Sequence, residues 1–171
     1  MVDPFFVIPI TKGLCYNCFD FKTDLQPIWR KNMKILGIDY GDARTGLSLS
    51  DITGMLAGSP SVISEWNREK LLDKLCDYIK QNNVEEIVLG YPKNMDGSIG
   101  ERAEKCKALA NDLADRTGLN VVLWDERQTT VAAHQILHQS GKKMKKHRQS
   151  VDAVAATLIL QGYLDFKRMQ K

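Results

Sequence analysis

Hydrophobic and polar positions form short, regular patterns in this chain from residue 33 onward. Residues 35–39 are an apolar run that ends on a carboxylate, and residues 47–50 alternate between leucine and serine. A glycine-containing connection at 41–46 joins the two runs, which is typical of a β-hairpin. Alternation places the two leucines of the second run on one face and the two serines on the other. A short third strand is expected at 61–64.

Helical and strand patterns alternate through the rest of the chain. The expected elements are, in order, a helix capped by Asn67 that ends near residue 82, a strand at 86–90, a helix at 101–117 stopped by Gly118, a strand at 120–126, a short helix from residue 129 or 130 to about 140, and a final helix at 151–167 capped by Ser150. The strand at 86–90 is wholly apolar, as in a parallel sheet buried on both faces. A hairpin extended by β–α–β crossovers predicts an α/β domain with a mixed five-stranded sheet flanked by helices.

The first 32 residues show no sustained periodicity of either kind. We expect residues 1–32 to be an N-terminal extension, either non-native or poorly packed, ahead of one domain at 33–171. The alternative is a capping segment that packs Phe5, Phe6 and Trp29 against the domain. An acidic start and a short apolar core disfavour a signal peptide.

Composition is that of an ordinary soluble globular protein, with 43% hydrophobic and 26% charged residues. No apolar run approaches the roughly 18 residues that a membrane span needs, so no membrane partner is expected. The four cysteines lack the spacing of a disulfide framework, and Cys15 and Cys18 form a single CxxC without a second pair. A reducing, cytoplasmic setting is therefore expected.

The net charge of +3 is small, but the positive charge is concentrated locally. Residues 142–148 hold five basic side chains and no acid. Such a run alone is usually a solvated face, but placed beside a catalytic site it could hold phosphates. The candidate phosphate-binding residues of this run are Lys142, Lys143, Lys145, Lys146 and Arg148.

Carboxylates stand at the ends of two predicted strands and near the start of the last predicted helix. Asp39 ends the first strand, Asp125 and Glu126 end the last, and Asp152 lies in the first turn expected for the final helix. Ligands in α/β sheets bind beyond the carboxyl ends of parallel strands, so these acids are expected to meet there. Three carboxylates suit Mg²⁺ or Mn²⁺, and two such ions can support phosphodiester cleavage. Structural roles remain open: Asp125 could pair with Arg127, and an acid is favourable near a helix N-terminus.

Four ordered motifs resemble one known family. They are GIDYGDARTGLSLSD at 37–51, GYPKNMDGS at 90–98, WDERQTT at 124–130 and VDAVAATLILQGYL at 151–164. They are similar to the motifs of the YqgF family, also called RuvX, which are Holliday-junction-resolvase-like proteins named as pre-16S rRNA nucleases. The resemblance covers 33–166.

This resemblance implies an RNase H-like fold, metal-dependent nuclease chemistry at the 5′ end of pre-16S rRNA, and a cytoplasmic bacterial setting. Carried over by motif, Asp39, Glu126 and Asp152 would be the catalytic metal ligands. Asp125 is a less certain ligand, because strand alternation lets only one of two adjacent residues face the metal. Arg44 is a further candidate phosphate contact, or else a turn residue paired with Asp42.

Other functions stay open at this stage. The domain could resolve branched DNA as a Holliday-junction resolvase, or bind RNA as a non-catalytic ribosome-assembly factor. The hairpin at 37–46 also resembles the phosphate-binding hairpin of the actin and sugar-kinase superfamily, but those proteins need a second domain, and no P-loop motif is present. Both a monomer and a homodimer are compatible with the sequence.

Overall fold

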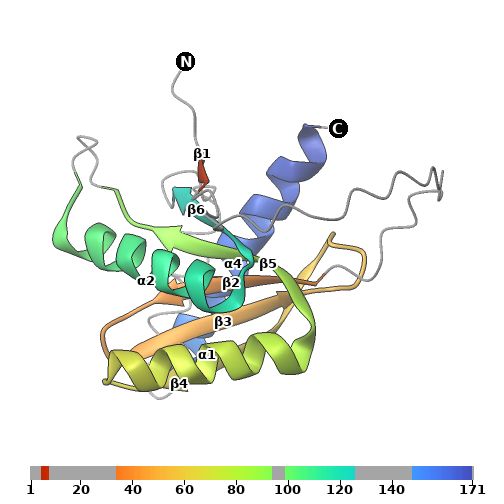
Figure 1. The fold of residues 1–171 in the computed structure, drawn as a ribbon. Coiled ribbons are helices and arrows are strands. Elements are labelled where there is room, and N and C mark those ends of the chain that lie inside the picture. The colour runs from red at the N-terminus through yellow and green to blue at the C-terminus, as the bar shows by residue number, and fades with distance from the viewer. Residues whose placement is uncertain (1–4, 8–33, 94–98, 126–147, 171) are drawn as a thin grey trace, which may run out of the picture.

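A single mixed sheet runs through the middle of the protein, with helices on both faces (Figure 1). This computed structural model describes residues 5–7, 34–93, 99–125 and 148–170. The strand order across the sheet is β1-β6-β5-β2-β3-β4. The strands are β1 (Phe5–Val7), β2 (Lys34–Tyr40), β3 (Arg44–Ser50), β4 (Ala57–Ser64), β5 (Val84–Tyr91) and β6 (Asn120–Asp125). Strands β2, β5 and β6 are parallel, whereas β3 and β4 form an antiparallel meander with β2.

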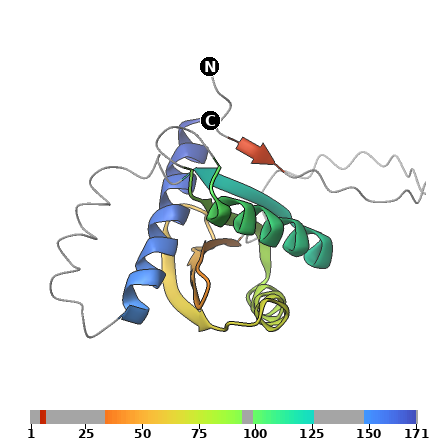
Figure 2. The ribbon, with the colours of Figure 1, turned by 90° about the vertical axis from the view of Figure 1, so that its left-hand side faces the viewer.

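The helices divide the core into two hydrophobic layers. Helices α1 (Arg68–Asn82) and α2 (Glu101–Thr117) cover one face of the sheet, and α4 (Arg148–Met169) covers the other (Figure 2). Leu36 and Ile38 of β2 pack in the first layer, whereas Ile35 packs in the second. This alternation means that successive residues of one strand serve different helices.

Local sequence signals determine where α1 and α2 begin and end. The Asn67 side chain accepts a hydrogen bond from the Lys70 backbone N–H at 3.1 Å, so the predicted cap of α1 is confirmed. Gly118 follows α2 with a positive φ of 68°, and its N–H donates to the Ala114 carbonyl at 2.8 Å. A glycine in this left-handed position ends the helix without strain, as predicted.

The two serines at the end of β3 are buried, like the two leucines with which they alternate. Ser48 donates its hydroxyl to the Gly58 carbonyl at 2.8 Å, and the Ser50 hydroxyl accepts from the Ile35 N–H at 2.9 Å. Because α4 covers their face, these side chains need partners inside the protein. The alternating pattern therefore marks a strand with a helix on each side.

The predicted mixed five-stranded sheet flanked by helices is confirmed, with three differences in detail. The strand expected at 61–64 begins earlier, at Ala57, and a sixth strand, β1, pairs with β6 through Phe5 and Trp124. The capping role expected of Ser150 is wrong, because α4 begins at Arg148 and includes Ser150. The short helix expected between residue 129 or 130 and residue 140 lies outside the described residues.

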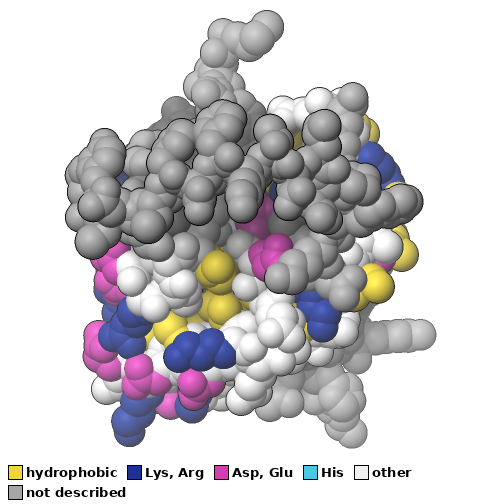
Figure 3. Space-filling model, turned by 45° about the vertical axis from the view of Figure 1, so that its right-hand side comes forward, with side chains coloured by type: hydrophobic (Ala, Val, Ile, Leu, Met, Phe, Trp, Pro, Cys, Tyr) yellow, Lys and Arg dark blue, Asp and Glu magenta, His cyan; other side chains and the backbone are white. Residues whose placement is uncertain are grey.

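Charged side chains of both signs are interspersed on the described surface of the face shown in Figure 3. Ion pairs link α1 to α2: Arg68 contacts Asp112 at 2.5 Å, and Arg116 pairs with both Glu69 and Asp73. Such exposed pairs contribute little individually to stability, since water screens them.

Candidate active site

The parallel strands end at one side of the sheet, which we call the site end and define by Tyr40, Tyr91 and Asp125. The other side, where these strands begin, is the opposite end. In sheets of this kind the site end is the usual place for ligands. Asp39, the penultimate residue of β2, lies there on the face covered by α4, because its neighbour Ile38 packs on the other face.

Two glycines allow α4 to approach the sheet closely. A Cβ on Gly37 would lie 2.6 Å from the Leu160 Cβ, and one on Gly46 would lie 2.0 Å from the Asp152 carbonyl oxygen. Gly46 is also the cross-strand partner of Asp39. Because Gly46 has no side chain, the backbone of Asp152 lies directly over β3, beside Asp39.

Arg44 and Arg102 flank these two acids. The Arg44 Nε lies 3.6 Å from an Asp152 carboxylate oxygen. The Arg102 guanidinium lies 3.8 Å from an Asp39 carboxylate oxygen and donates to the Tyr40 carbonyl at 3.3 Å. The alternative pairing of Arg44 with Asp42 is not found among the described ion pairs; the Lys105 ammonium contacts Asp42 at 3.3 Å. Two acids and two arginines thus meet at the site end.

Arg102 is a candidate site residue that the sequence reasoning missed. It occupies the first turn of α2, after the connection from β5, and β5 is the parallel neighbour of β2. A helix that follows a parallel strand begins at the carboxyl end of the sheet, so this adjacency was the available signal. Its side chain is 63% exposed, which leaves the guanidinium open to a ligand.

The environment of Asp39 disfavours its negative charge. Burial raises the pKa of the Asp39 carboxyl above its ordinary value, the Arg102 guanidinium lowers it, and the nearby Asp152 raises it again, with burial dominant. Repulsion between two carboxylates is relieved when a cation binds between them. The oxygen donors at this site therefore fit a hard divalent ion such as Mg²⁺ or Mn²⁺.

Asp125 lies on the other face of the sheet from Asp39. Its strand partner is Tyr91, which packs in the α1–α2 layer. The Asp125 side chain is 8% exposed and contacts the Lys93 ammonium at 3.6 Å. The structure therefore brings Asp39 and Asp152 together but keeps Asp125 apart from them.

Several predicted site residues lie outside the described residues. These are Glu126 and the lysines of the basic run, whereas Arg148 is described only as the backbone start of α4. Within the described ranges, no group of three or more histidine, cysteine or acidic side chains could hold a metal ion. A complete ligand set would need a donor beyond Asp39 and Asp152.

Among the helices of the described residues, none has both the length and the apolar character of a membrane span.

Solved structures with a similar arrangement define the class of fold. RuvC from Thermus thermophilus, in complex with a Holliday junction substrate, superposes with a TM-score of 0.56 at 15% sequence identity, covering 81% of this chain and 97% of that one. The fowlpox virus resolvase with Holliday junction DNA gives a TM-score of 0.50 at 10% identity, covering 81% of this chain and 100% of that one. The domain therefore has the RNase H-like fold of resolvases, as predicted.

Sequence comparison identifies the family. The model of the family described as "RuvX: Holliday junction resolvase" matches residues 33–166, so the chain belongs to this family. A relative from Carboxydothermus hydrogenoformans is 42% identical over 135 residues, covering 79% of this chain and 98% of the relative. One from Bacillus cytotoxicus is 44% identical over 138 residues, covering 79% of this chain and 100% of the relative. Both carry the name "Putative pre-16S rRNA nuclease".

Proposed function

We propose that this protein is a metal-dependent nuclease that processes the 5′ end of pre-16S rRNA during ribosome biogenesis in the bacterial cytoplasm. The observation that carries the proposal is the meeting of Asp39 and Asp152 at the site end, where α4 contacts β3 at Gly46. Family membership and the names of close relatives support the nuclease reaction and the RNA substrate.

In this proposal the carboxylates of Asp39, Asp152 and Glu126 hold Mg²⁺ or Mn²⁺. When bound, such ions supply an activated water molecule and stabilise the leaving oxygen of the phosphodiester. Water adds across one P–O bond, so one product carries the phosphate and the other a hydroxyl group. The packing of α4 against β2 and β3 fixes the two aspartates beside each other, and it leaves the Asp39 side chain only 18% exposed to solvent.

Arg44 and Arg102 bind the substrate backbone. Each guanidinium lies beside one of the acids, at 3.6 Å from Asp152 and 3.8 Å from Asp39. Arginine presents several donors to phosphate oxygens, and hydrogen bonds between charged groups are the strong ones. We assign the lysines of 142–146 and Arg148 to the same role along the substrate, because they immediately precede or begin the helix that carries Asp152.

Branched DNA is the second candidate substrate. The RuvC structure with a Holliday junction motivates it through the shared fold. Resolution of a junction requires two cuts related by two-fold symmetry, and thus a homodimer, whereas RNA trimming can be done by a monomer. Light scattering of the purified protein, alone and with each nucleic acid, distinguishes these states.

Cleavage by the purified full chain tests the proposal. The substrates are a 5′-extended pre-16S rRNA fragment and a four-way DNA junction, each with Mg²⁺, Mn²⁺ or EDTA. We expect metal-dependent cleavage of the RNA, abolished by Asp39→Asn and retained by Asp115→Asn, which changes an exposed acid of α2. RNA binding without cleavage would instead favour the non-catalytic assembly factor, and cleavage of the junction alone would favour the resolvase.

A further inference from the structure

Trp66 is an exposed aromatic residue beside the candidate active site. Among the described residues, six large hydrophobic side chains are exposed, and Trp66 is the only aromatic one, at 82% exposure. Burying an aromatic side chain of this size would stabilise the fold. The protein leaves that apolar surface open to solvent.

Backbone contacts place Trp66 at the site end. Strand β4 runs toward this end, and its last residue, Ser64, pairs with Arg44. The next residue, Glu65, continues the pairing, because its N–H donates to the Ala43 carbonyl at 3.2 Å. Trp66 therefore follows immediately beside the turn that connects β2 to β3, next to the arginine that contacts Asp152.

Strand register sets the separation between Trp66 and the acids. Asp39 pairs with Gly46, and Gly46 pairs with Val62 of β4. Two strand spacings place Val62 about 10 Å from Asp39, and Trp66 lies four residues beyond Val62, at most about 13 Å further along the strand direction. Because these two displacements are perpendicular, the backbone of Trp66 lies up to about 16 Å from that of Asp39. A single strand held at Asp39 therefore reaches Trp66 a few nucleotides away from the phosphate at the acids.

A network of hydrogen bonds holds the backbone of Trp66 in place. One Glu65 carboxylate oxygen accepts from the N–H groups of Trp66 and Asn67, at 3.1 and 3.2 Å. The other contacts the Lys74 ammonium at 2.7 Å. Lys74 is also the main reason why the pKa of Glu65 is lowered, so the carboxylate stays charged in this role. The indole thus extends from a fixed turn, and its ordering on a ligand costs only side-chain entropy.

We propose that Trp66 is a stacking platform for an unpaired base of the substrate, a few nucleotides from the scissile phosphate. This inference rests on the proposed nuclease function and specifies its substrate class as nucleic acid with a single-stranded segment. Proteins that bind single strands combine basic contacts to the backbone with aromatic rings on which bases stack. Arg44 and the exposed Lys70, which follows Trp66 on the first turn of α1, supply positive charge on either side. In a duplex the bases stack on each other and are unavailable to the indole.

Binding measured without cleavage tests this inference. Fluorescence anisotropy in EDTA compares a labelled single-stranded RNA with the same RNA annealed to its complement, using the full chain. We expect Trp66→Ala to weaken single-strand binding at least about fivefold, as the loss of one base–aromatic stack predicts. Trp66→Phe should recover part of the loss, and duplex binding should change less than about twofold. Met55→Ala, at an exposed hydrophobic residue between β3 and β4 at the opposite end, should leave both affinities unchanged.

The outcomes separate this inference from the proposed function. The stacking role would be overturned if Trp66→Ala bound the single strand with wild-type affinity. It would also be overturned if the variant lost the same factor of affinity for the single strand and for the duplex. Thermal unfolding of each variant excludes misfolding as the cause of a loss. If the wild-type chain fails to cleave RNA but its single-strand binding depends on Trp66, the nuclease proposal fails while the binding inference stands.

Discussion

Gly46 of β3 and Asp152 of α4 are in direct backbone contact: a Cβ on the glycine would lie 2.0 Å from the aspartate carbonyl oxygen. Even the smallest side chain at this position must displace α4 from the sheet. Because Gly46 is paired with Asp39, displacement would also separate the two acids. The close approach of helix and strand is thus a condition for the candidate active site.

Gly46→Ala should therefore reduce both stability and cleavage. Overpacking of a core typically costs 1–3 kcal/mol, and we expect a loss of about that size in the free energy of unfolding. Urea unfolding and RNA cleavage measure the two effects. Gly58→Ala is the matched control, because a Cβ there meets nothing within 4 Å. Equal behaviour of the two variants would contradict the packing argument.

Asp39→Asn should stabilise the metal-free protein at neutral pH while it abolishes cleavage. Burial raises the pKa of Asp39, so the folded state disfavours the ionised carboxyl and loses stability at pH values where that group is charged. The gain from asparagine should shrink as the pH falls and the wild-type carboxyl becomes protonated. Urea unfolding in EDTA across the pH range measures this; a gain that grows toward acid pH would be contrary to the prediction.

Arg102→Ala should weaken RNA binding and cleavage. Loss of a charged hydrogen bond to phosphate costs about 1.5–3 kcal/mol, which corresponds to roughly a tenfold or greater decrease in kcat/KM. The variant should also show a weaker dependence of binding on salt. Arg168→Ala serves as control, because it removes an exposed arginine that pairs with Asp165 near the end of α4, far from Asp152. A normal salt dependence in Arg102→Ala would argue against a phosphate contact.

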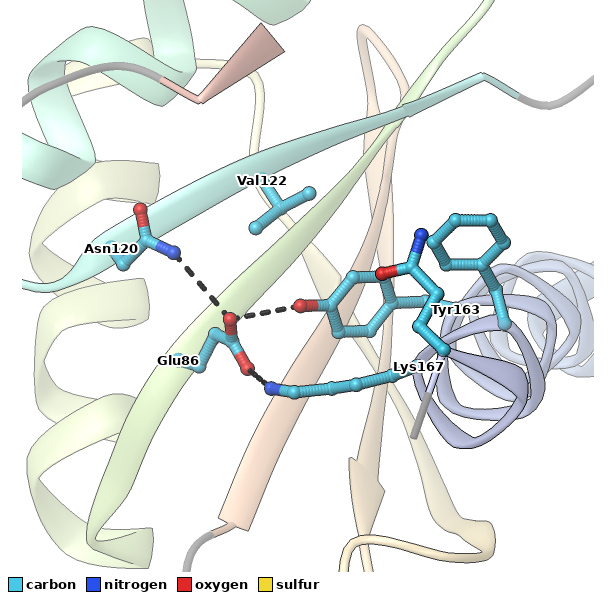
Figure 4. A pocket seen from close by; sticks show the side chains of 7 residues that line it. Glu86, Asn120, Val122, Tyr163 and Lys167 are labelled. Atoms are coloured by element: carbon cyan, nitrogen blue, oxygen red, sulfur yellow. Dashed lines mark hydrogen bonds and ion pairs between the residues drawn. The ribbon is translucent and has the colours of Figure 1, made fainter. Parts of the chain in front are cut away.

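The Glu86 cluster at the opposite end of the sheet should support stability without affecting cleavage. Figure 4 shows Tyr163 and Lys167 of α4 directed at the Glu86 carboxylate, at 2.9 and 2.5 Å, beside a pocket of about 230 Å³. Tyr163→Phe removes a hydrogen bond to a charged acceptor, so we expect a loss of about 1.5 kcal/mol or more in the free energy of unfolding. RNA cleavage should stay at the wild-type rate.

Tyr163 should also make the wild-type fold sensitive to alkaline pH. Burial, with the Glu86 charge and hydrogen bond, raises the pKa of the Tyr163 phenol above the ordinary 10.0. The folded state then keeps a proton that the unfolded chain releases, so stability is fully present below pH 10.0 and falls as the pH rises above it. In Tyr163→Phe this part of the alkaline loss should be absent, as urea unfolding at increasing pH would show.

Deletion of residues 1–32 should leave cleavage intact. In the described structure this segment contributes β1, a three-residue edge strand that pairs with β6. We expect full RNA cleavage by residues 33–171 and a small decrease in thermal stability from the exposed β6 edge. A truncated protein that is inactive or unfolded would favour the capping role over the extension.

Local patterns in the sequence determined most of the fold. The apolar runs, the Asn67 cap and the Gly118 stop act within a few residues, and each is found where the sequence predicts it. The start of α4 was placed too late, because Ser150 is a good capping residue but the helix continues back to Arg148. A residue that favours the cap position can also lie inside a helix, so a local signal alone does not fix where a helix begins.

Tertiary structure alone decided which side chains share the site. The sequence places Asp39 and Asp125 at the ends of two strands, but the alternation of each strand relative to its helices puts them on different faces. Arg102 and Trp66 reach the site end through the pairing of β5 with β2 and of β4 with β3, which are contacts between distant segments. Residue types and spacing set the available chemistry, whereas strand order and the close packing at Gly46 set which groups act together.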